Sequence, residues 1–426
     1  MSNLERDPSE LVIAGGTGAV ATTTPSGSVE AGSATAGART APGDTADGPG
    51  PVLLLLPRDV PLGGPRAMNV RRTLPQRGRS TIGAWCFIDH YGPDEIVVAH
   101  TPEIGSGTAS GIQPGVVAGA REEAAGGVAD GARRGMVVPP HPHTGLQTVS
   151  WLFEGEIEHR DSTGSHAPVL PGELNLMTAG RGISHSEVST PDTRVLHGVQ
   201  LWLALPEEHR HQSPHFEHHL VPQMSLGGGA NARVFIGTLG TGAGTGTGTG
   251  TGTLGAGTGT GTGTGTGPAS LEPGAGAIVS AAQVYSPVLG AQVDLPSGAV
   301  LDLALDPAFE HGILVDRGPV LVEGVTLARS ELGYLAEGRG SIRLENHARH
   351  PARVLLLGGE PFTEKLVMWW NFIGRSHEEV VAWRAEWQSE VIEGADAAGR
   401  FGTVPGYPGP ALPAPELPTV RLKPRS

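Results

Sequence analysis

Hydrophobic and polar residues alternate in short runs along much of this chain, and these runs predict β-strands. Turn residues such as Glu154-Gly155 and Pro171-Gly172 separate the runs. The strand-like runs of the first half are 69–74, 82–88, 148–153, 156–160, 173–177 and 195–205. Because short strands follow one another across glycine turns, the pattern favours a β-sandwich or β-barrel over β-α-β units.

The same pattern resumes in the second half and then gives way to a helix. A further set of strand-like runs covers 292–295, 299–305, 312–315, 320–322, 341–344 and 353–357, and predicts a second β unit of similar size. Ser376 and Glu379 form a capping box, and Val380, Trp383 and Trp387 fall on one face of the helix that follows. Seven prolines after residue 402 predict an extended, mobile tail.

Composition separates the foldable part of the chain from solvated segments. Residues 1–50, 101–136 and 238–267 hold 32 of the 66 glycines and no aromatic residue. Such segments cannot form a packed core. We therefore predict a disordered tail at 1–50, an N-terminal domain at 51–236 with a Gly/Ala-rich insert at 97–136, a Gly-Thr loop at 237–280, a C-terminal domain at 281–400 and a Pro-rich tail at 401–426.

Charge and rare residues exclude several classes of protein. A net charge of −14 argues against direct binding to nucleic acid. The two lysines, Lys365 and Lys423, exclude a Gly-Lys-Ser/Thr phosphate loop, and the single Cys86 excludes an intrachain disulfide. The longest apolar run, 52–56, is too short to span a bilayer. We expect a cytoplasmic monomer that does not bind membranes.

Two histidine-containing pairs carry the candidate chemistry. His141 and His143 lie two positions apart on an extended segment, as do His185 and Glu187. Alternate residues of a strand share one face, so neighbouring strands would bring the four side chains together. Three imidazoles and one carboxylate suit iron, nickel, zinc or copper, and surface histidines are the alternative. Glu156, Glu158 and Asp161 are spaced as a solvent-facing strand edge without a catalytic role.

The segments that contain these pairs resemble the pirin family. The resemblance is carried by 141–161, which begins His-Pro-His-Thr-Gly, and by 171–187, 197–202 and 356–361. Pirins are bicupins of the cupin superfamily, so the resemblance implies an all-β chain of two cupin-type barrels with a C-terminal helix. It also implies one metal ion, usually iron, held in the N-terminal barrel by His141, His143, His185 and Glu187. The second barrel is expected to carry no metal.

One residue departs from the family pattern. Many pirins have Glu where this chain has Gln147. Since the acidic ligand of pirins is the later glutamate, here Glu187, a neutral Gln147 is compatible with the site. We expect it to remove one negative charge close to the metal and so to influence metal affinity or redox potential.

Three functions fit this site. The first is a quercetin 2,3-dioxygenase-like enzyme that uses O2 to cleave a flavonol or a related enolic or phenolic substrate, with Glu187 as both ligand and base. The metal would be one divalent ion, Fe(II) by preference, with Ni, Cu, Zn or Mn as alternatives. The second is a redox-responsive regulator that binds transcription factors or metabolic enzymes. The third is a metal-free structural protein.

Overall fold

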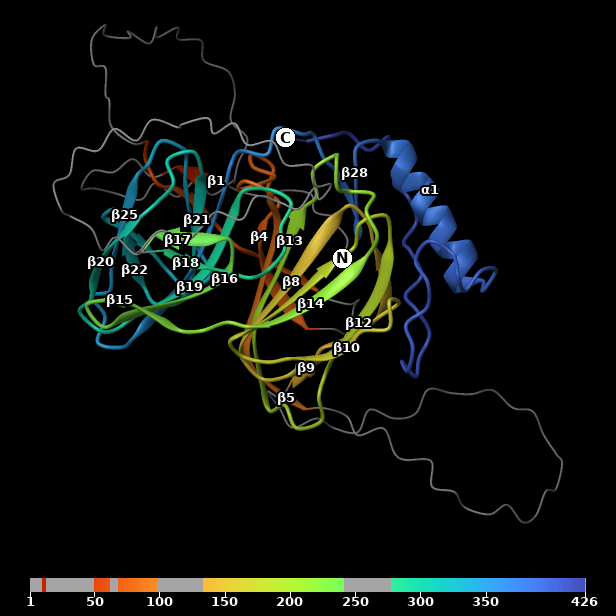
Figure 1. Ribbon diagram of the computed structural model, residues 1–426, viewed down its shortest axis with the longest axis horizontal. Coiled ribbons are helices and arrows are strands. Elements are labelled where there is room, and N and C mark those ends of the chain that lie inside the picture. Colours follow the sequence, from red (N-terminus) through yellow and green to blue (C-terminus); the bar gives the residue numbers. More distant parts are fainter. Residues whose placement is uncertain (1–9, 13–49, 62–67, 98–132, 241–276, 426) are drawn as a thin grey trace, which may run out of the picture.

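The chain folds into two β units that lie side by side, with an α-helix against the first (Figure 1). The computed structural model describes residues 10–12, 50–61, 68–97, 133–240 and 277–425. Most of the tail, insert and loop predicted at 1–50, 97–136 and 237–280 lies outside these residues. Within the predicted disordered tail, residues 10–12 instead form a strand that pairs with residues 53–55. Within the described residues, the predicted all-β bicupin fold with a C-terminal helix is confirmed.

The N-terminal unit consists of a large and a small antiparallel sheet that face each other. The large sheet has the order β14-β11-β8-β13-β5-β4-β3 and the small one β10-β9-β12-β7, and β6 (Arg133–Arg134) pairs with β5 in parallel. The large sheet comprises β3 (Arg58–Pro61), β4 (Asn69–Leu74), β5 (Trp85–Val97), β8 (Leu146–Glu154), β11 (Glu173–Thr178), β13 (Val195–Ala204) and β14 (His215–Leu220). The small sheet comprises β7 (Val137–His143), β9 (Ile157–Asp161), β10 (His166–Val169) and β12 (Ile183–Ser189).

The C-terminal unit also pairs a large sheet with a small one. Their orders are β1-β2-β24-β21-β26-β19-β16-β15 and β20-β25-β22-β23. The large sheet comprises β1 (Glu10–Val12), β2 (Leu53–Leu55), β15 (Met224–Gly227), β16 (Ala230–Ile236), β19 (Val288–Leu295), β21 (Glu310–Arg317), β24 (Leu332–Leu335) and β26 (Ala352–Gly359). The small sheet comprises β20 (Val300–Ala304), β22 (Val320–Val322), β23 (Val325–Leu327) and β25 (Ser341–Glu345), and a hairpin joins β17 (Thr238–Gly240) to β18 (Ala277–Val279).

Sheet membership does not follow the predicted boundary at residue 236. β2 pairs with β24, and β16 pairs with β19, so both strands belong to the C-terminal sheet although they precede that boundary. The strands of the second unit thus come from both sides of the first unit in the sequence. The two units are therefore interleaved along the sequence.

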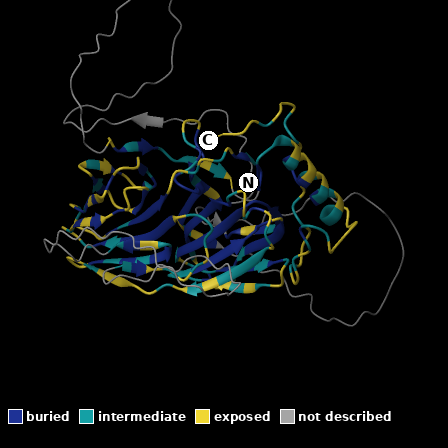
Figure 2. Ribbon diagram, turned by 45° about the horizontal axis from the view of Figure 1, so that its top comes forward, coloured by how far each residue is buried: buried dark blue, intermediate teal, exposed yellow. Residues whose placement is uncertain are grey.

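The large sheets of the two units pack face to face and form a shared core. Trp85, Val149 and Trp151 of the first unit meet Phe235 and Leu355 of the second. The indole nitrogen of Trp85 lies 3.1 Å from the carbonyl oxygens of residues 289 and 358, so the buried ring keeps a hydrogen-bond acceptor. Figure 2 shows buried residues running through the centre of both units. β8 is buried along most of its length, so its polar residues Gln147, Thr148 and Ser150 are buried together with its apolar ones.

A buried charged cluster lies at one edge of this interface. The Asp316 carboxylate, on β21, accepts hydrogen bonds from His197 Nε2 at 2.5 Å and from His90 Nε2 at 2.9 Å, and Ser330 Oγ is 3.0 Å from His90 Nδ1. Arg353 approaches the other Asp316 oxygen at 3.5 Å. Burial lowers the pKa of His90 to about 4, so its imidazole is neutral at neutral pH despite the adjacent carboxylate.

Acid is expected to weaken the fold through His90. Its pKa is about 4 in the folded chain and about 6.5 when unfolded, so the unfolded chain binds the extra proton between these values. Stability is then complete above about pH 6.5 and falls as the pH drops toward 4, by on the order of 3 kcal/mol for this group. Urea unfolding of metal-free protein at pH 7.5 and pH 5 should show a smaller loss for His90→Gln than for wild type. Equal losses in the two proteins would contradict this role.

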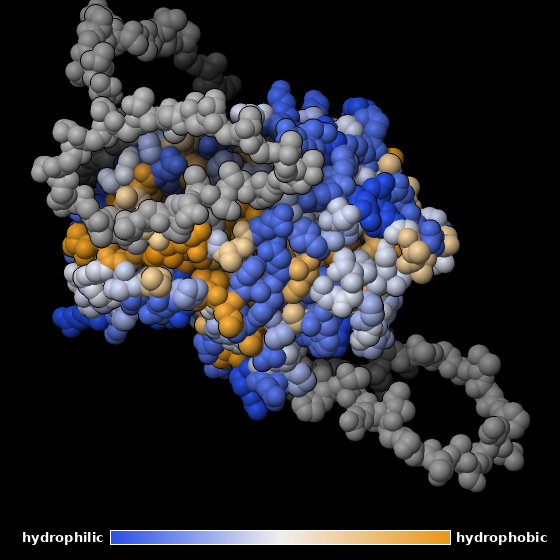
Figure 3. All heavy atoms as spheres, in the orientation of Figure 1, coloured by the Kyte–Doolittle hydropathy of each residue, from blue (hydrophilic) through white to orange (hydrophobic). Residues whose placement is uncertain are grey.

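The C-terminal segment packs along the first unit. Helix α1 (His377–Trp387) starts at the predicted Ser376–Glu379 capping box, continues into the π-helical turn η1 (Gln388–Ile392), and buries Val380, Trp383 and Trp387. It lies beside the hairpin formed by β27 (Val367–Trp369) and β28 (Phe372–Gly374). The view in Figure 3 shows apolar residues gathered over the second unit and a more hydrophilic surface around α1. No helix in the described part of the chain has the length and apolar character needed to cross a membrane.

The Pro-rich tail differs from the mobile segment that the sequence predicts. Phe401 is fully buried, and the indole nitrogen of Trp387 donates to the carbonyl of Leu412 at 2.8 Å. The Leu412 amide in turn donates to the Pro140 carbonyl at 2.8 Å. The tail is extended, as its prolines require, but the occasional apolar residues between them fix it against α1 and β7.

Candidate metal centre

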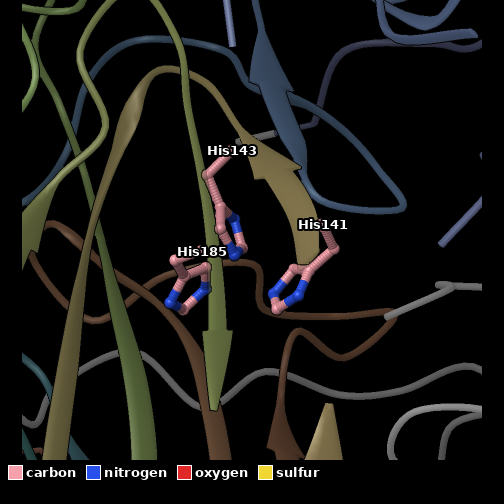
Figure 4. Close-up of side chains that lie close together, drawn as sticks. All are labelled: His141, His143 and His185. Atoms are coloured by element: carbon pink, nitrogen blue, oxygen red, sulfur yellow. The ribbon is translucent and has the colours of Figure 1, made fainter. Parts of the chain in front are cut away.

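Three histidines converge inside the N-terminal unit (Figure 4). His141 and His143 come from β7 and His185 from β12, its antiparallel neighbour, where His185 lies directly opposite His141. The ring centroids are 4.4 Å apart for His141 and His185, 4.9 Å for His143 and His185, and 5.0 Å for His141 and His143. The alternation of side chains in a strand thus places the two members of the His-x-His pair on one face, as predicted.

Hydrogen bonds to backbone carbonyls orient two of the three rings. His141 Nδ1 donates to the Pro139 carbonyl at 2.9 Å, and His143 Nδ1 donates to the Asn371 carbonyl at 3.2 Å. Each of these rings is thereby left with a lone pair on Nε2. His185 Nε2 is buried and has no hydrogen-bond partner among the described residues. A buried imidazole nitrogen that lacks a partner and lies beside two other imidazole rings is expected of a ligand for a cation.

Burial keeps these imidazoles in the neutral form that binds metals. It lowers the pKa of His141 to about 3 and the pKa values of His143 and His185 well below the ordinary value. Neighbouring imidazoles add to the effect for His143 and His185, because a proton on one ring repels a proton on the next. No proton has to leave these rings before a metal binds at neutral pH.

Glu187 lies beside this group. It is on β12 two residues after His185, but the pairing of β12 with β7 shifts between them, so that Glu187 is opposite Val138. Its carboxylate groups with His185 and His159, with the potential ligand atoms within 4.8 Å of one another. Ser150 Oγ donates to Glu187 Oε1 at 2.9 Å. Burial raises the pKa of Glu187, against the opposing effects of His159 and Ser150.

Two further residues of the small sheet lie beside the histidines: His159, which the sequence did not predict, and Asp161, which was predicted to face solvent. On β9, His159 is the cross-strand partner of Glu187, and Asp161 is the partner of His185. Both side chains are buried, Asp161 completely, whereas Asp161 was expected at a solvent-facing edge. The available signal was their spacing of two residues, which is the same as in the two ligand pairs.

The opposite sheet supplies an apolar and a polar row facing the histidines. Trp202 stacks on Phe87 with centroids 4.0 Å apart and makes a T-shaped contact with His143, with centroids 5.1 Å apart. The polar row crosses β8, β13, β5 and β4 through residues paired across the strands, namely Ser150, Gln200, Asp89 and Arg72. The three histidines therefore face an aromatic row and a row of hydrogen-bonding groups on the opposite sheet.

Gln147 does not contact this site. Its Nε2 donates to Thr178 Oγ1 at 2.9 Å and to the Gln283 carbonyl at 3.0 Å. Gln147 and Ser150 are three residues apart on β8, so they point to opposite faces of the sheet. The expected removal of a negative charge close to the metal therefore does not apply, because the amide makes its contacts outside the histidine cluster.

Comparisons with known proteins agree over most of the chain. The family models for Pirin and for the Pirin C-terminal cupin domain match residues 67–203 and 290–393. A Pseudomonas aeruginosa protein named "Putative quercetin 2,3-dioxygenase" is 37% identical over 361 residues, covering 85% of this chain and 89% of that protein. A "Pirin-like protein" of Caulobacter vibrioides is 29% identical over 328 residues, covering 75% and 88%.

A solved structure extends the agreement to the fold. The crystal structure of quercetin 2,3-dioxygenase from Acinetobacter baumannii superimposes with a TM-score of 0.64 and 29% identity. The superposition covers 88% of this chain and 97% of that one. The similarity thus spans both β units.

Proposed function

Because this chain belongs to the pirin family, we propose that it is a metal-dependent dioxygenase that acts on a flavonol of the quercetin type or a related enolic or phenolic compound. His141, His143, His185 and Glu187 hold one divalent metal ion in this proposal. The single observation that carries it is the convergence of three buried imidazoles, His141, His143 and His185, whose potential ligand atoms lie within 4.8 Å of one another.

The donor set fits a metal of the first transition series. Three neutral imidazoles and a carboxylate suit Fe(II), which we propose as the physiological ion, and also Ni, Cu, Zn or Mn. The three imidazoles and the Glu187 carboxylate, which Ser150 orients through Oε1, would hold the ion. The bound metal would supply Lewis acidity and a centre that reacts with O2.

The residues of this chain supply substrate binding and proton transfer. Trp202, whose ring centroid lies 5.1 Å from that of His143, is the aromatic side chain that would contact an aromatic substrate, and Phe87 supports it by stacking. Burial raises the pKa of Glu187, which makes its carboxylate a stronger base for the proton of the substrate hydroxyl. Ser150 lies 3.0 Å from Gln200 Oε1 as well as 2.9 Å from Glu187, so it can keep the carboxylate oriented as the proton arrives. The overall reaction consumes one O2, cleaves the flavonol ring and releases carbon monoxide.

Oxygen uptake tests the proposal directly. Protein loaded with Fe(II), Ni(II) or Cu(II), with free metal removed, should consume O2 with quercetin and release carbon monoxide in a ratio of one to one. Metal-free protein is the matched control and should do neither. Loaded protein that consumes no O2 with any flavonol would overturn the dioxygenase proposal.

One contact favours a second function, a redox-responsive regulator of transcription factors or metabolic enzymes. The Asn371 carbonyl that orients His143 lies in the β27–β28 turn, whose neighbour Phe372 packs against Trp383 of α1 with centroids 6.0 Å apart. A change at the metal could therefore reach helix α1 through His143, Asn371 and Phe372. Hydrogen exchange over residues 367–387 should differ between ferrous and ferric protein if this function holds, and identical exchange would contradict it.

A further inference from the structure

Metal ligand His185 has a different supporting partner from the other two histidines. Backbone carbonyls orient His141 and His143. His185 Nδ1 instead lies 3.5 Å from Nδ1 of His159, and His159 Nε2 lies 3.2 Å from Asp161 Oδ2. We propose that His159 and Asp161 are positioning residues that orient His185 and increase its electron donation to the metal. This inference rests on the metal site proposed above.

The carboxylate at the end of this chain is fixed in place. Asp161 Oδ1 accepts hydrogen bonds from the Thr163 amide at 2.9 Å, the Thr163 hydroxyl at 2.6 Å and the Ser165 amide at 3.1 Å. These bonds occupy Oδ1 and leave Oδ2 for His159. Although burial favours the neutral acid, the bonds from His159 and Thr163 lower the pKa of Asp161, so it stays ionised.

The ring of His159 is fixed by packing. It is 2% exposed and stacks on Phe216 of β14, with centroids 4.6 Å apart and an interplanar angle of 18°. The register of β9 against β12 fixes the position of His159 along the strand relative to His185. Stacking on one face and a carboxylate at one edge leave the Nδ1 edge of His159 directed toward His185.

The positions of the protons follow from the ionised Asp161. Because the carboxylate can only accept, His159 carries its proton on Nε2 and is an acceptor at Nδ1. His185 then donates from Nδ1 and keeps a lone pair on Nε2, the atom that has no other partner. A carboxylate acting through an imidazole makes His185 a more basic ligand than one bonded to a backbone carbonyl.

Metal affinity of two variants tests this inference. His159→Gln removes the acceptor for His185. Asp161→Asn presents an amide that can donate to His159 Nε2, which moves the His159 proton to Nδ1 so that two donors face each other. Titration with Ni(II) against a chromophoric chelator should show dissociation constants raised by about 10- to 100-fold in both variants. X-ray absorption should still count three imidazole ligands.

Controls separate this role from folding and from the metal site itself. His166→Gln, on the neighbouring β10, changes a histidine whose side chain is 57% exposed and should keep wild-type affinity. Unchanged affinity in Asp161→Asn and His159→Gln would overturn the inference. The loss of one imidazole ligand in His159→Gln would also overturn it, by making His159 a ligand. If wild-type protein itself binds no Ni(II), the proposed metal site fails, which is a different result.

Discussion

Replacing His141 with alanine is expected to lower the affinity for the metal by more than about 100-fold, beyond the range seen when residues behind the ligands are changed. His141 is one of three buried imidazoles, its Nδ1 is fixed by Pro139, and it lies across the strand from His185. Removing it leaves at most two imidazoles and one carboxylate. Metal content after purification and Ni(II) titration measure the loss, and oxygen uptake with quercetin should disappear with it.

The apo protein provides a second readout for the same variant. Burial lowers the pKa of His141 to about 3, so the folded wild type resists protonation of this ring down to that pH. Wild-type protein should lose stability as the pH falls below about 6.5, and His141→Ala should lose less. His347→Ala, in the second unit with a side chain that is 60% exposed, is the control and should behave as wild type. Full metal content in His141→Ala would contradict the assignment of His141 as a ligand.

Replacing Asp89 with alanine is expected to destabilise the fold by about 3–5 kcal/mol, the usual effect of removing one partner of a buried ion pair. Arg72 binds both Asp89 oxygens, at 2.7 and 2.9 Å, and the two side chains are 1% and 0% exposed. The guanidinium also lies over the Phe87 ring at 4.3 Å. Without Asp89, the buried charge of Arg72 loses its bidentate acceptor beside the aromatic wall of the site.

Urea unfolding followed by tryptophan fluorescence measures this effect. Asp302→Ala removes a carboxylate that also binds an arginine, Arg343, but both side chains are more than half exposed, so its unfolding midpoint should stay near that of wild type. Asp89→Asn, which keeps the shape and loses the charge, should also be strongly destabilised. A midpoint for Asp89→Ala equal to that of Asp302→Ala would show that the buried pair contributes little.

Strand pattern and residue spacing predicted the fold class and the three converging histidines for a physical reason. Alternate residues of a strand share a face, so His141 and His143 could be placed together without knowing the rest of the fold. Pairing between strands has no comparable local signal. Two features could therefore not be predicted: that β16 joins the second unit, and that His159 lies beside Glu187. Both depend on the register between distant segments.

Two errors in the sequence analysis have the same origin. Gln147 follows His143 closely in the sequence but belongs to the next strand and faces away from the site. The Pro-rich tail lacks a periodic pattern, yet its apolar residues pack against α1, and its backbone hydrogen-bonds to β7. In both cases the outcome depends on tertiary contacts, which are absent from composition and from local periodicity.

The hydrogen bond from His143 to Asn371 also bears on how the protein is made. The two residues are 228 positions apart. At 5 to 20 residues per second, a ribosome needs roughly 10 to 45 s to reach the second residue after the first. During that interval the nascent N-terminal strands lack the carbonyl that orients one of the three imidazoles. The histidine cluster is therefore completed only late in translation. A shortened chain that ends after the first unit would lack the carbonyl that orients His143, so we expect it not to reproduce the site of the full chain.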